Sequence, residues 1–172
     1  MKKFNVLFVC TGNSCRSQMA EAILNKIGSD KFNGYSAGSS PETGKYPETR
    51  GVHPRAYLLL KENGYPVEKL HSKSWDSFLK QADKIDFVFT LCDKAQAEME
   101  DSCPVFPGQP MTAHWGVFDP AAAAGPDDKI DRVFRDVFTI IRRRIELFTS
   151  LPLDSLETLA LKQKLDDIGK QQ

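Results

Sequence analysis

The sequence predicts an α/β fold in which helices cover both faces of a parallel sheet. Two short runs rich in β-branched and aromatic residues, 5–10 and 85–92, are typical of strands buried on both faces. Stretches with apolar residues at helical spacing separate the expected strands, and this alternation favours parallel pairing. With 172 residues, 41% of them hydrophobic, the chain is long enough to bury a core without disulfides.

In the first half of the chain, helical spacing and turn residues mark the elements. Apolar positions repeat from Met19 to Ile27, and a proline at 54 occupies its favoured place in a first helical turn. Residues 39–52 are rich in Pro, Gly, Ser and Thr, and we expect them to form an exposed loop. The expected elements are a strand (5–10), a helix ending at Gly28, a strand (32–37), a loop (39–52) and a helix from Pro54 to about 63–64.

The second half of the chain is expected to hold two more strands and three helices. One long helix carries a continuous apolar face from Ile130 to Phe148. The other expected elements before residue 150 are a short helix (75–82), a strand (85–92), a short fourth strand (103–107) and a long loop (111–128).

The last segment predicts one more amphipathic helix. Asp154 and Glu157 form an Asp-x-x-Glu pattern that is typical of a helix cap, and the helix is expected to end near Ile168. We therefore assign residues 1–150 to the main domain and residues 151–172 to a helical extension, which either packs on that domain or projects from it.

Composition argues against several classes of partner. Lys plus Arg and Asp plus Glu number 23 each, so the chain lacks the basic footprint of a protein that binds nucleic acid or acidic membranes. No apolar run approaches the ~20 residues of a membrane span, and the run after Lys2 and Lys3 is too short for a secretion signal. We expect a cytoplasmic protein whose four cysteines serve chemistry rather than a disulfide framework.

The stretch CTGNSCR, residues 10–16, lies where the first strand passes directly into a helix. Free amides at a helix start carry partial positive charge and bind anions, and Gly12 and Asn13 allow a tight turn of the backbone. We expect inward-pointing amides to form an oxyanion nest, with the Arg16 guanidinium clasping two oxygens. The residues assigned to oxyanion binding are Thr11, Gly12, Asn13, Ser14, Cys15, Arg16 and Ser17.

Cys10 lies at the base of this nest and is the expected nucleophile. The amides, with the hydroxyl of Ser14 or Ser17, are expected to stabilise its thiolate and to lower its pKa from ~8.5 into the ~3.5–7.5 range. The alternative is a small core residue at a strand end, with Arg16 an ordinary surface arginine. The position of both residues between a buried strand and a helix favours the functional interpretation.

A reaction of a bound oxyanion also needs an acid that protonates the departing oxygen. Asp119 lies in the long loop at 111–128, which can reach over the nest, and Pro120 stiffens it. An ordinary turn aspartate before proline is the competing interpretation. The rival aspartates, which lack such a context, are Asp93, Asp101, Asp127 and Asp128.

Cys92 and Cys103 predict thiol exchange near the nest. Cys10 and Cys92 each end an expected strand, and ligand sites in parallel sheets lie beyond the carboxyl ends of the strands. A disulfide between them requires Cα atoms within ~4.4–6.8 Å. Cys103 follows a polar, helix-prone stretch that is able to rearrange; the alternative is a pair of inert thiols. Cys15 either protects Cys10 through a reversible disulfide or packs beneath the loop.

Five stretches together resemble the arsenate reductases built on the low-molecular-weight protein tyrosine phosphatase fold. They are VLFVCTGNSCRSQMAEAIL, YSAG, FVFTLC, CPVFPG and HWGVFDPA, and the resemblance covers about residues 4–149. It implies a four-stranded parallel sheet flanked by helices, to which this chain adds a C-terminal helix. The implied reaction is the reduction of arsenate to arsenite.

The resemblance also implies roles for the site residues. Cys10 attacks arsenate held by Arg16 and the loop amides, and Asp119 assists the leaving hydroxide. Cys92 then releases arsenite and leaves a Cys10–Cys92 disulfide, which Cys103 resolves to Cys92–Cys103. The implied reductant is an external thiol protein, thioredoxin rather than glutathione–glutaredoxin, with no tightly bound cofactor. We expect a monomer or weak dimer.

Two features depart from the family pattern. The spacing between Cys92 and Cys103 is about four residues longer than usual, close to one helical turn. Family members often hold a potassium ion near the nest, and Asn13, Glu21 and Ser36 match that site. The aspartate usually found there is replaced near Ser74, however, so we assign no metal to this chain.

The main alternative function is a phosphotyrosine phosphatase, because phosphate and arsenate share charge and shape. Such phosphatases usually carry aromatic residues after the Asp-Pro pair, whereas DPAAAAG at 119–125 offers only small side chains and favours a small oxyanion. Weak phosphatase activity is still expected. A non-catalytic oxyanion sensor is a third class, but it has no need for Cys10, Asp119 and two further thiols together.

Overall fold

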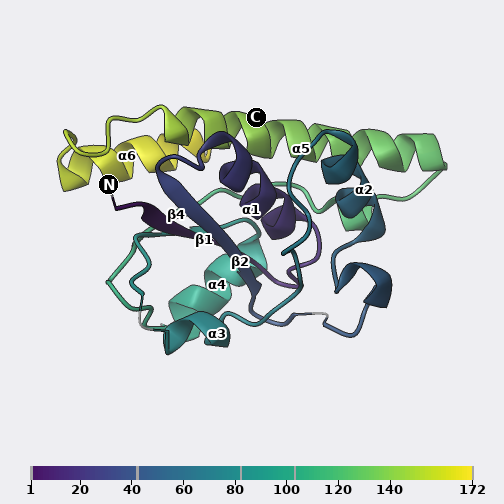
Figure 1. Ribbon diagram of the computed structural model, residues 1–172, viewed down its shortest axis with the longest axis horizontal. Helices are drawn as coiled ribbons and strands as arrows, with labels where there is room; N and C mark the ends of the chain where they lie inside the picture. The colour runs from purple at the N-terminus through teal and green to yellow at the C-terminus, as the bar shows by residue number, and fades with distance from the viewer. Residues whose placement is uncertain (1, 42, 82, 103, 172) are drawn as a thin grey trace.

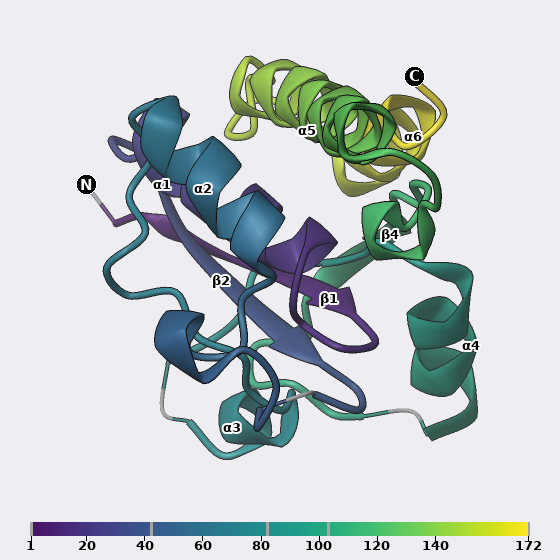
Figure 2. The same ribbon diagram turned by 90° about the vertical axis from the view of Figure 1, so that its right-hand side faces the viewer.

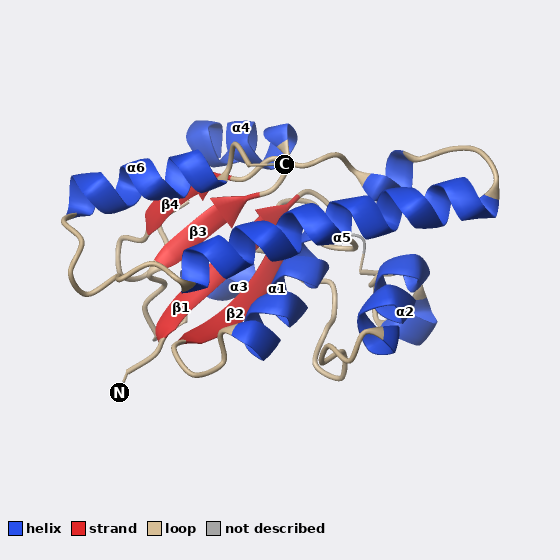
Figure 3. Cartoon of the chain, turned by 90° about the horizontal axis from the view of Figure 1, so that it is seen from above, coloured by secondary structure: helices blue, strands red, loops and turns tan. Residues whose placement is uncertain are grey.

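The computed structural model describes residues 2–41, 43–81, 83–102 and 104–171. Within these ranges a single parallel sheet of four strands forms the centre of the molecule (Figure 1), and the strand order is β2-β1-β3-β4 (Figure 3). This confirms the predicted four-stranded parallel sheet. The strands are β1 (Phe4–Cys10), β2 (Phe32–Gly38), β3 (Phe87–Thr90) and β4 (Met111–His114).

Helices cover both faces of the sheet, as the sequence predicts. α1 and α5 pack together over one face, and α3 and α4 lie on the opposite side (Figure 2). α6 runs along the β4 edge (Figure 3). The helices are α1 (Arg16–Ile27), α2 (Pro54–Glu62), α3 (Asp76–Leu79), α4 (Asp93–Ser102), α5 (Asp127–Thr149) and α6 (Thr158–Ile168), with 3-10 turns at Pro47–Thr49 and Pro120–Ala122.

β1 is the inner strand that positions the functional loop. Its residues Val6–Val9 are fully buried, as expected for a parallel strand covered on both faces. Cys10 ends this strand opposite Gly38 of β2. A Cβ on Gly38 would lie 2.5 Å from the Thr11 carbonyl oxygen, so only glycine permits this close approach.

The predicted fourth strand at 103–107 is wrong. Cys103 lies outside the described residues, and residues 104–106 form no regular structure. Pro104 and Pro107 lack the N–H groups that a strand ladder requires. The fourth strand is β4, which the sequence analysis placed in the long loop at 111–128 because this edge strand buries only Ala113 and lacks a continuous apolar run.

The predicted cap at Asp154 is also wrong, because α6 begins later, at Thr158. The Ser155 N–H donates to the Pro152 carbonyl at 3.1 Å, so this stretch forms a turn. Glu157 stands at the N-cap position without a side-chain hydrogen bond. α6 packs on the main body: the Trp115 indole N–H donates to the Leu165 carbonyl at 2.9 Å. The division at residue 150 stays a prediction.

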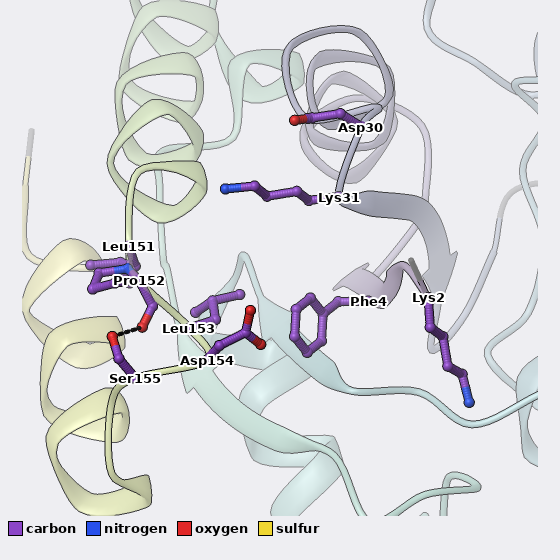
Figure 4. A pocket seen from close by; sticks show the side chains of 9 residues that line it. All are labelled: Lys2, Phe4, Asp30, Lys31, Leu151, Pro152, Leu153, Asp154 and Ser155. Carbon is purple, nitrogen blue, oxygen red and sulfur yellow. Dashed lines mark hydrogen bonds between the residues drawn. The ribbon is translucent and has the colours of Figure 1, made fainter.

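A cavity of about 450 Å³ opens at the amino end of the sheet. Figure 4 shows Phe4 at its wall, between Lys2 and the segment that joins α5 to α6, which includes Leu153. Because the oxyanion loop follows the other end of β1, this cavity is separate from the site below. Among the described residues, no helix is long and apolar enough to cross a membrane.

Candidate active site

The oxyanion loop, residues 11–16, joins β1 to α1 through a tight turn. Asn13 adopts a left-handed backbone conformation with φ of 52°, which few residues besides glycine tolerate. Cys15 is the N-cap of α1, and Arg16 is the first helical residue. The start of α1 therefore points its free N–H groups into the turn.

The carbonyl groups of the loop point away from its centre, because each accepts a hydrogen bond from surrounding structure. In a planar trans peptide the next N–H points the opposite way, so the amides of residues 11–15 converge. This arrangement forms the oxyanion nest. The bonds run from Ser39 N to Cys10 O (3.1 Å), Ser40 N to Thr11 O (2.9 Å), Ser72 Oγ to Gly12 O (3.1 Å), Gln18 Nε2 to Asn13 O (2.9 Å) and His53 N to Ser14 O (2.9 Å).

Cys10 lies at the floor of the nest in a hydrogen bond with Ser17. Its Sγ is 2.9 Å from Ser17 Oγ. Asn13 Nδ2 donates to the same Ser17 oxygen at 2.7 Å, so the hydroxyl hydrogen of Ser17 is free to point at the sulfur. Asn13 and Ser17 are fully buried behind the loop and act on Cys10 from there, rather than lining the cavity.

The pKa of Cys10 differs from the sequence-based expectation. Burial raises the pKa of this thiol, which is only 3% exposed, above its ordinary value. The hydrogen bond from Ser17 and the charge of Arg16 lower the pKa but do not outweigh the loss of hydration. Of the groups predicted to stabilise the thiolate, the Ser17 hydroxyl is confirmed, and burial is the opposing effect that sequence spacing did not show.

Arg16 connects the nest to the loop that carries Asp119. Its Nη1 donates to the Val117 carbonyl at 3.1 Å, and its Nη2 lies 3.7 Å from Asp119 Oδ2. The Asp119 carboxylate also accepts the Ala121 N–H at 3.0 Å, which fixes its direction. Of the five aspartates considered from sequence, Asp119 alone lines the oxyanion cavity. Asp127, for example, pairs with Arg55 instead.

Cys92 lies beside the nest, as its position after β3 predicts. Its Sγ is 3.3 Å from Thr11 Oγ1 and accepts the Ala95 N–H, at 3.4 Å, from the first turn of α4. The negative charge of a Cys92 thiolate would raise the pKa of Cys10, as burial does. Cys103 lies outside the described residues, so its predicted role stays a prediction.

The oxyanion cavity has a volume of about 310 Å³, and two of the residues that line it, Ser40 and Lys45, were not predicted from the sequence. Lys45, from the loop before α2, lines it together with Cys10, Arg16 and Asp119. A lysine in a loop rich in Gly and Pro carries no recognisable signal in the sequence. Ala121 and Ala122 line the same cavity, in agreement with the small side chains expected after Asp119.

A second cavity of about 500 Å³ adjoins the first and is lined by Arg16 and Cys92. His114 lies in its wall, with Nδ1 2.8 Å from Thr90 Oγ1 and Nε2 3.0 Å from Asp93 Oδ1. Sequence spacing did not indicate this arrangement, because His114 and Asp93 belong to different elements.

Cys15 is buried in the loop, and burial raises its pKa to about 12. The negative charge of Asp119 acts in the same direction, whereas a hydrogen bond from Ser14 lowers the pKa. Cys15 is consequently a poor nucleophile in this conformation.

The residues matched to a potassium site do not fit such an ion. Ser36 Oγ donates to Glu21 Oε1 at 2.7 Å, and the Lys73 ammonium lies 3.7 Å from the same oxygen. The Asn13 Oδ1 atom accepts the Lys73 N–H at 2.9 Å. A lysine charge therefore already faces the carboxylate, and a backbone amide occupies the Asn13 oxygen.

Comparison with known proteins agrees with this geometry. The family described as low molecular weight phosphotyrosine protein phosphatase matches residues 5–163. An arsenate reductase of Halalkalibacterium halodurans is 41% identical over 148 residues, which cover 86% of this chain and 96% of the relative. An arsenate reductase 1 of Staphylococcus epidermidis is 42% identical over 121 residues, covering 70% of this chain and 81% of the relative.

Solved structures of arsenate reductases are also similar to this chain. An arsenate reductase in the reduced state is 29% identical, with a TM-score of 0.60, over 86% of this chain and 97% of the other. A thioredoxin-dependent arsenate reductase of Corynebacterium glutamicum is 26% identical, with a TM-score of 0.56, over 89% of this chain and 64% of the other. Two curated relatives, from Halalkalibacterium halodurans and Staphylococcus epidermidis, are arsenate reductases, and the chain itself belongs to the low molecular weight phosphotyrosine protein phosphatase family.

Proposed function

We propose that this protein reduces arsenate to arsenite, with Cys10 as the nucleophile. The loop amides and Arg16 bind the oxyanion, and the Cys10 sulfur at the cavity floor attacks arsenic. Asp119 gives a proton to the departing oxygen, which leaves as water. The product of this step is a covalent Cys10–S–As(V) adduct.

The second step transfers two electrons from sulfur to arsenic. Cys92 attacks the Cys10 sulfur, and the sulfur–arsenic bond breaks with its electron pair remaining on arsenic. Arsenic is reduced from As(V) to As(III) and leaves as arsenite, while the two thiols are oxidised to a Cys10–Cys92 disulfide. The proton of the Cys92 thiol passes to solvent or to arsenite.

The position of Cys92 is the observation that carries this proposal. Its Sγ lies 3.3 Å from Thr11 Oγ1, at the rim of the nest that holds Cys10. Hydrolysis of a phosphate ester needs one nucleophile, an oxyanion site and an acid, but no second thiol. Reduction of a bound oxyanion by two electrons consumes two thiols, and Cys92 is placed to supply the second from within the chain.

We propose that Cys103 then attacks Cys92, frees Cys10 and forms a Cys92–Cys103 disulfide, which an external dithiol protein reduces. Thioredoxin is the proposed reductant, since the related Corynebacterium glutamicum protein is described as thioredoxin-dependent. The cytoplasm, which keeps thiols reduced, is the proposed compartment. The proposed oligomeric state is a monomer or weak dimer.

The test is arsenate-dependent oxidation of NADPH by the purified protein, coupled through thioredoxin and thioredoxin reductase. We expect turnover in the wild type and its loss in Cys10→Ser, Cys92→Ser and Cys103→Ser. Hydrolysis of para-nitrophenyl phosphate is the matched control, because of these three thiols it needs only Cys10. Cys92→Ser is expected to keep this hydrolysis. Fast hydrolysis without arsenate turnover would overturn the proposal.

Phosphatase activity is the second candidate function. Phosphate shares the charge and shape of arsenate, so we expect the nest to accept both, and Phe118, which is 60% exposed and precedes Asp119, offers a surface for an aryl ring. The small Ala121 and Ala122 side chains that line the oxyanion cavity give such a ring little contact. We therefore expect hydrolysis of aryl phosphates to be a weak side activity, measurable as a low kcat/KM with para-nitrophenyl phosphate.

A further inference from the structure

A buried ion pair lies behind the oxyanion loop. The Lys73 Nζ atom is 3.7 Å from Glu21 Oε1, and these side chains are only 16% and 9% exposed. Glu21 comes from α1, whereas Lys73 belongs to the segment that runs beside the end of β2 and joins it through a Gly38–Ser74 bridge. None of the steps proposed above uses this pair.

Each side chain of the pair stabilises the charged form of the other. Burial raises the pKa of Glu21 and lowers the pKa of Lys73, so burial acts against the charged form of each side chain. The charge of each residue acts on the pKa of its partner in the opposite direction. Removing one partner leaves an uncompensated buried charge, which is strongly unfavourable.

A continuous chain of hydrogen bonds joins the Lys73 segment to the nucleophile. The Lys73 N–H donates to Asn13 Oδ1 at 2.9 Å, which fixes the orientation of the amide so that Nδ2 faces Ser17. Asn13 Nδ2 donates to Ser17 Oγ at 2.7 Å, and Ser17 Oγ lies 2.9 Å from Cys10 Sγ. The position of the Lys73 backbone thereby sets the hydrogen bond to the sulfur.

The Lys73 side chain anchors that backbone. Its ammonium donates to the His71 carbonyl at 2.7 Å and faces Glu21, whose Oε1 also accepts the Ser36 hydroxyl at 2.7 Å. The ammonium thus occupies a pocket of oxygen atoms from two segments and holds them together. A monovalent cation bound at the same oxygens would have the same effect.

We propose that Lys73 is a positioning residue that supplies a built-in cation, so that the oxyanion loop keeps its active arrangement without a bound metal ion. The inference rests on the proposed role of Cys10 as nucleophile. It concerns the loop rather than the substrate, and it can be tested without arsenate.

The test replaces Lys73 by methionine, which keeps the length of the side chain and removes the charge. The readout is the rate of Cys10 alkylation by iodoacetamide, followed by peptide mass spectrometry, in about 150 mM KCl or choline chloride, near physiological ionic strength. In choline we expect alkylation about tenfold slower than in the wild type, equivalent to about 1.4 kcal/mol. In KCl we expect the alkylation rate of Lys73→Met to recover. The wild-type rate is expected to be the same in both salts.

Three further variants separate positioning from folding. Lys73→Arg keeps the charge and is expected to restore the rate without potassium. The double variant Glu21→Gln/Lys73→Met lacks the carboxylate and is expected to lose the potassium response while remaining folded by thermal unfolding. Lys69→Met makes the same change at another lysine of the neighbouring cavity and is expected to behave as wild type.

Two results would overturn the inference. One is a wild-type rate that itself depends on potassium. The other is a folded Lys73→Met protein whose rate is either unchanged or low in both salts. Steady-state arsenate turnover is measured separately: its absence from the wild type would refute the proposed function, while the alkylation result would still decide the role of Lys73.

Discussion

Arg144 of α5 is expected to stabilise the loop that carries Asp119 by binding the main chain at the start of that loop. Its side chain is 2% exposed and donates three hydrogen bonds to main-chain carbonyls. Nη1 binds the carbonyls of Trp115, at 2.7 Å, and Gly116, at 3.1 Å, and Nε binds that of Gln171 at 2.9 Å. One guanidinium thus joins α5 to the start of the Asp119 loop and to the end of the chain beyond α6.

The size of this effect follows from the contacts. Hydrogen bonds from charged donors contribute about 1.5–3 kcal/mol each, so three contribute roughly 4.5–9 kcal/mol if they add fully. Burial opposes this gain, and it lowers the pKa of Arg144. We expect Arg144→Met, which retains an apolar stem, to lower the free energy of unfolding by about 3 kcal/mol. For a chain of this length that corresponds to a fall in Tm of about 6–12 °C.

The assay is thermal and urea unfolding followed by circular dichroism, with Arg142→Met as the matched control. Arg142 lies on the same helix but is half exposed and pairs with Glu146 at 2.8 Å. An exposed pair of this kind contributes about 0.3–0.5 kcal/mol. If Arg144→Met loses no more stability than Arg142→Met, the guanidinium does not hold the loop and the reasoning is refuted.

Four other predictions concern the site itself. Ser17→Ala removes a contact that favours the Cys10 thiolate, so the midpoint pH of Cys10 alkylation is expected to rise by about 1–2 units; an unchanged midpoint would contradict this. Asp119→Asn is expected to lower arsenate kcat by about 10²–10⁴-fold in the coupled assay, and a near-normal kcat would exclude it as the acid. Lys45→Met is expected to raise the arsenate KM up to about fivefold at unchanged kcat, whereas an unaltered KM would remove Lys45 from oxyanion binding. Because burial raises the pKa of Cys15 to about 12, only about one thiol in 10⁴ is ionised at pH 8, and iodoacetamide is expected to modify Cys15 only after unfolding; mass spectrometry of native protein checks this.

The position of the oxyanion loop could be predicted because it depends on patterns within a short stretch of sequence. The apolar run of β1 and the helical spacing of α1 fix both ends of the oxyanion loop, and the geometry in between follows from chain stereochemistry. Asn13 does adopt the left-handed conformation that its type tolerates. Cys92 was placed near the nest from strand position alone, because parallel strands end at one edge of the sheet.

The remaining features depend on packing between distant segments. β4 is an edge strand with little apolar signal, so its pairing with β3 follows from the closed fold rather than from composition. The Glu21–Lys73 pair joins residues 52 positions apart, and no spacing rule relates them. Burial at Cys10 likewise results from the assembled core, which is why the pKa of this thiol moves opposite to the sequence-based expectation.

The most direct test of the account is a single turnover without any reductant. Fully reduced protein is mixed with equimolar arsenate, and arsenite is measured together with the remaining thiols and the disulfide-linked peptides. We predict one arsenite per chain, the loss of two of the four thiols, and a Cys10–Cys92 disulfide in the Cys103→Ser variant. Arsenate left unreduced, with all four thiols intact, would contradict the proposed reduction at Cys10.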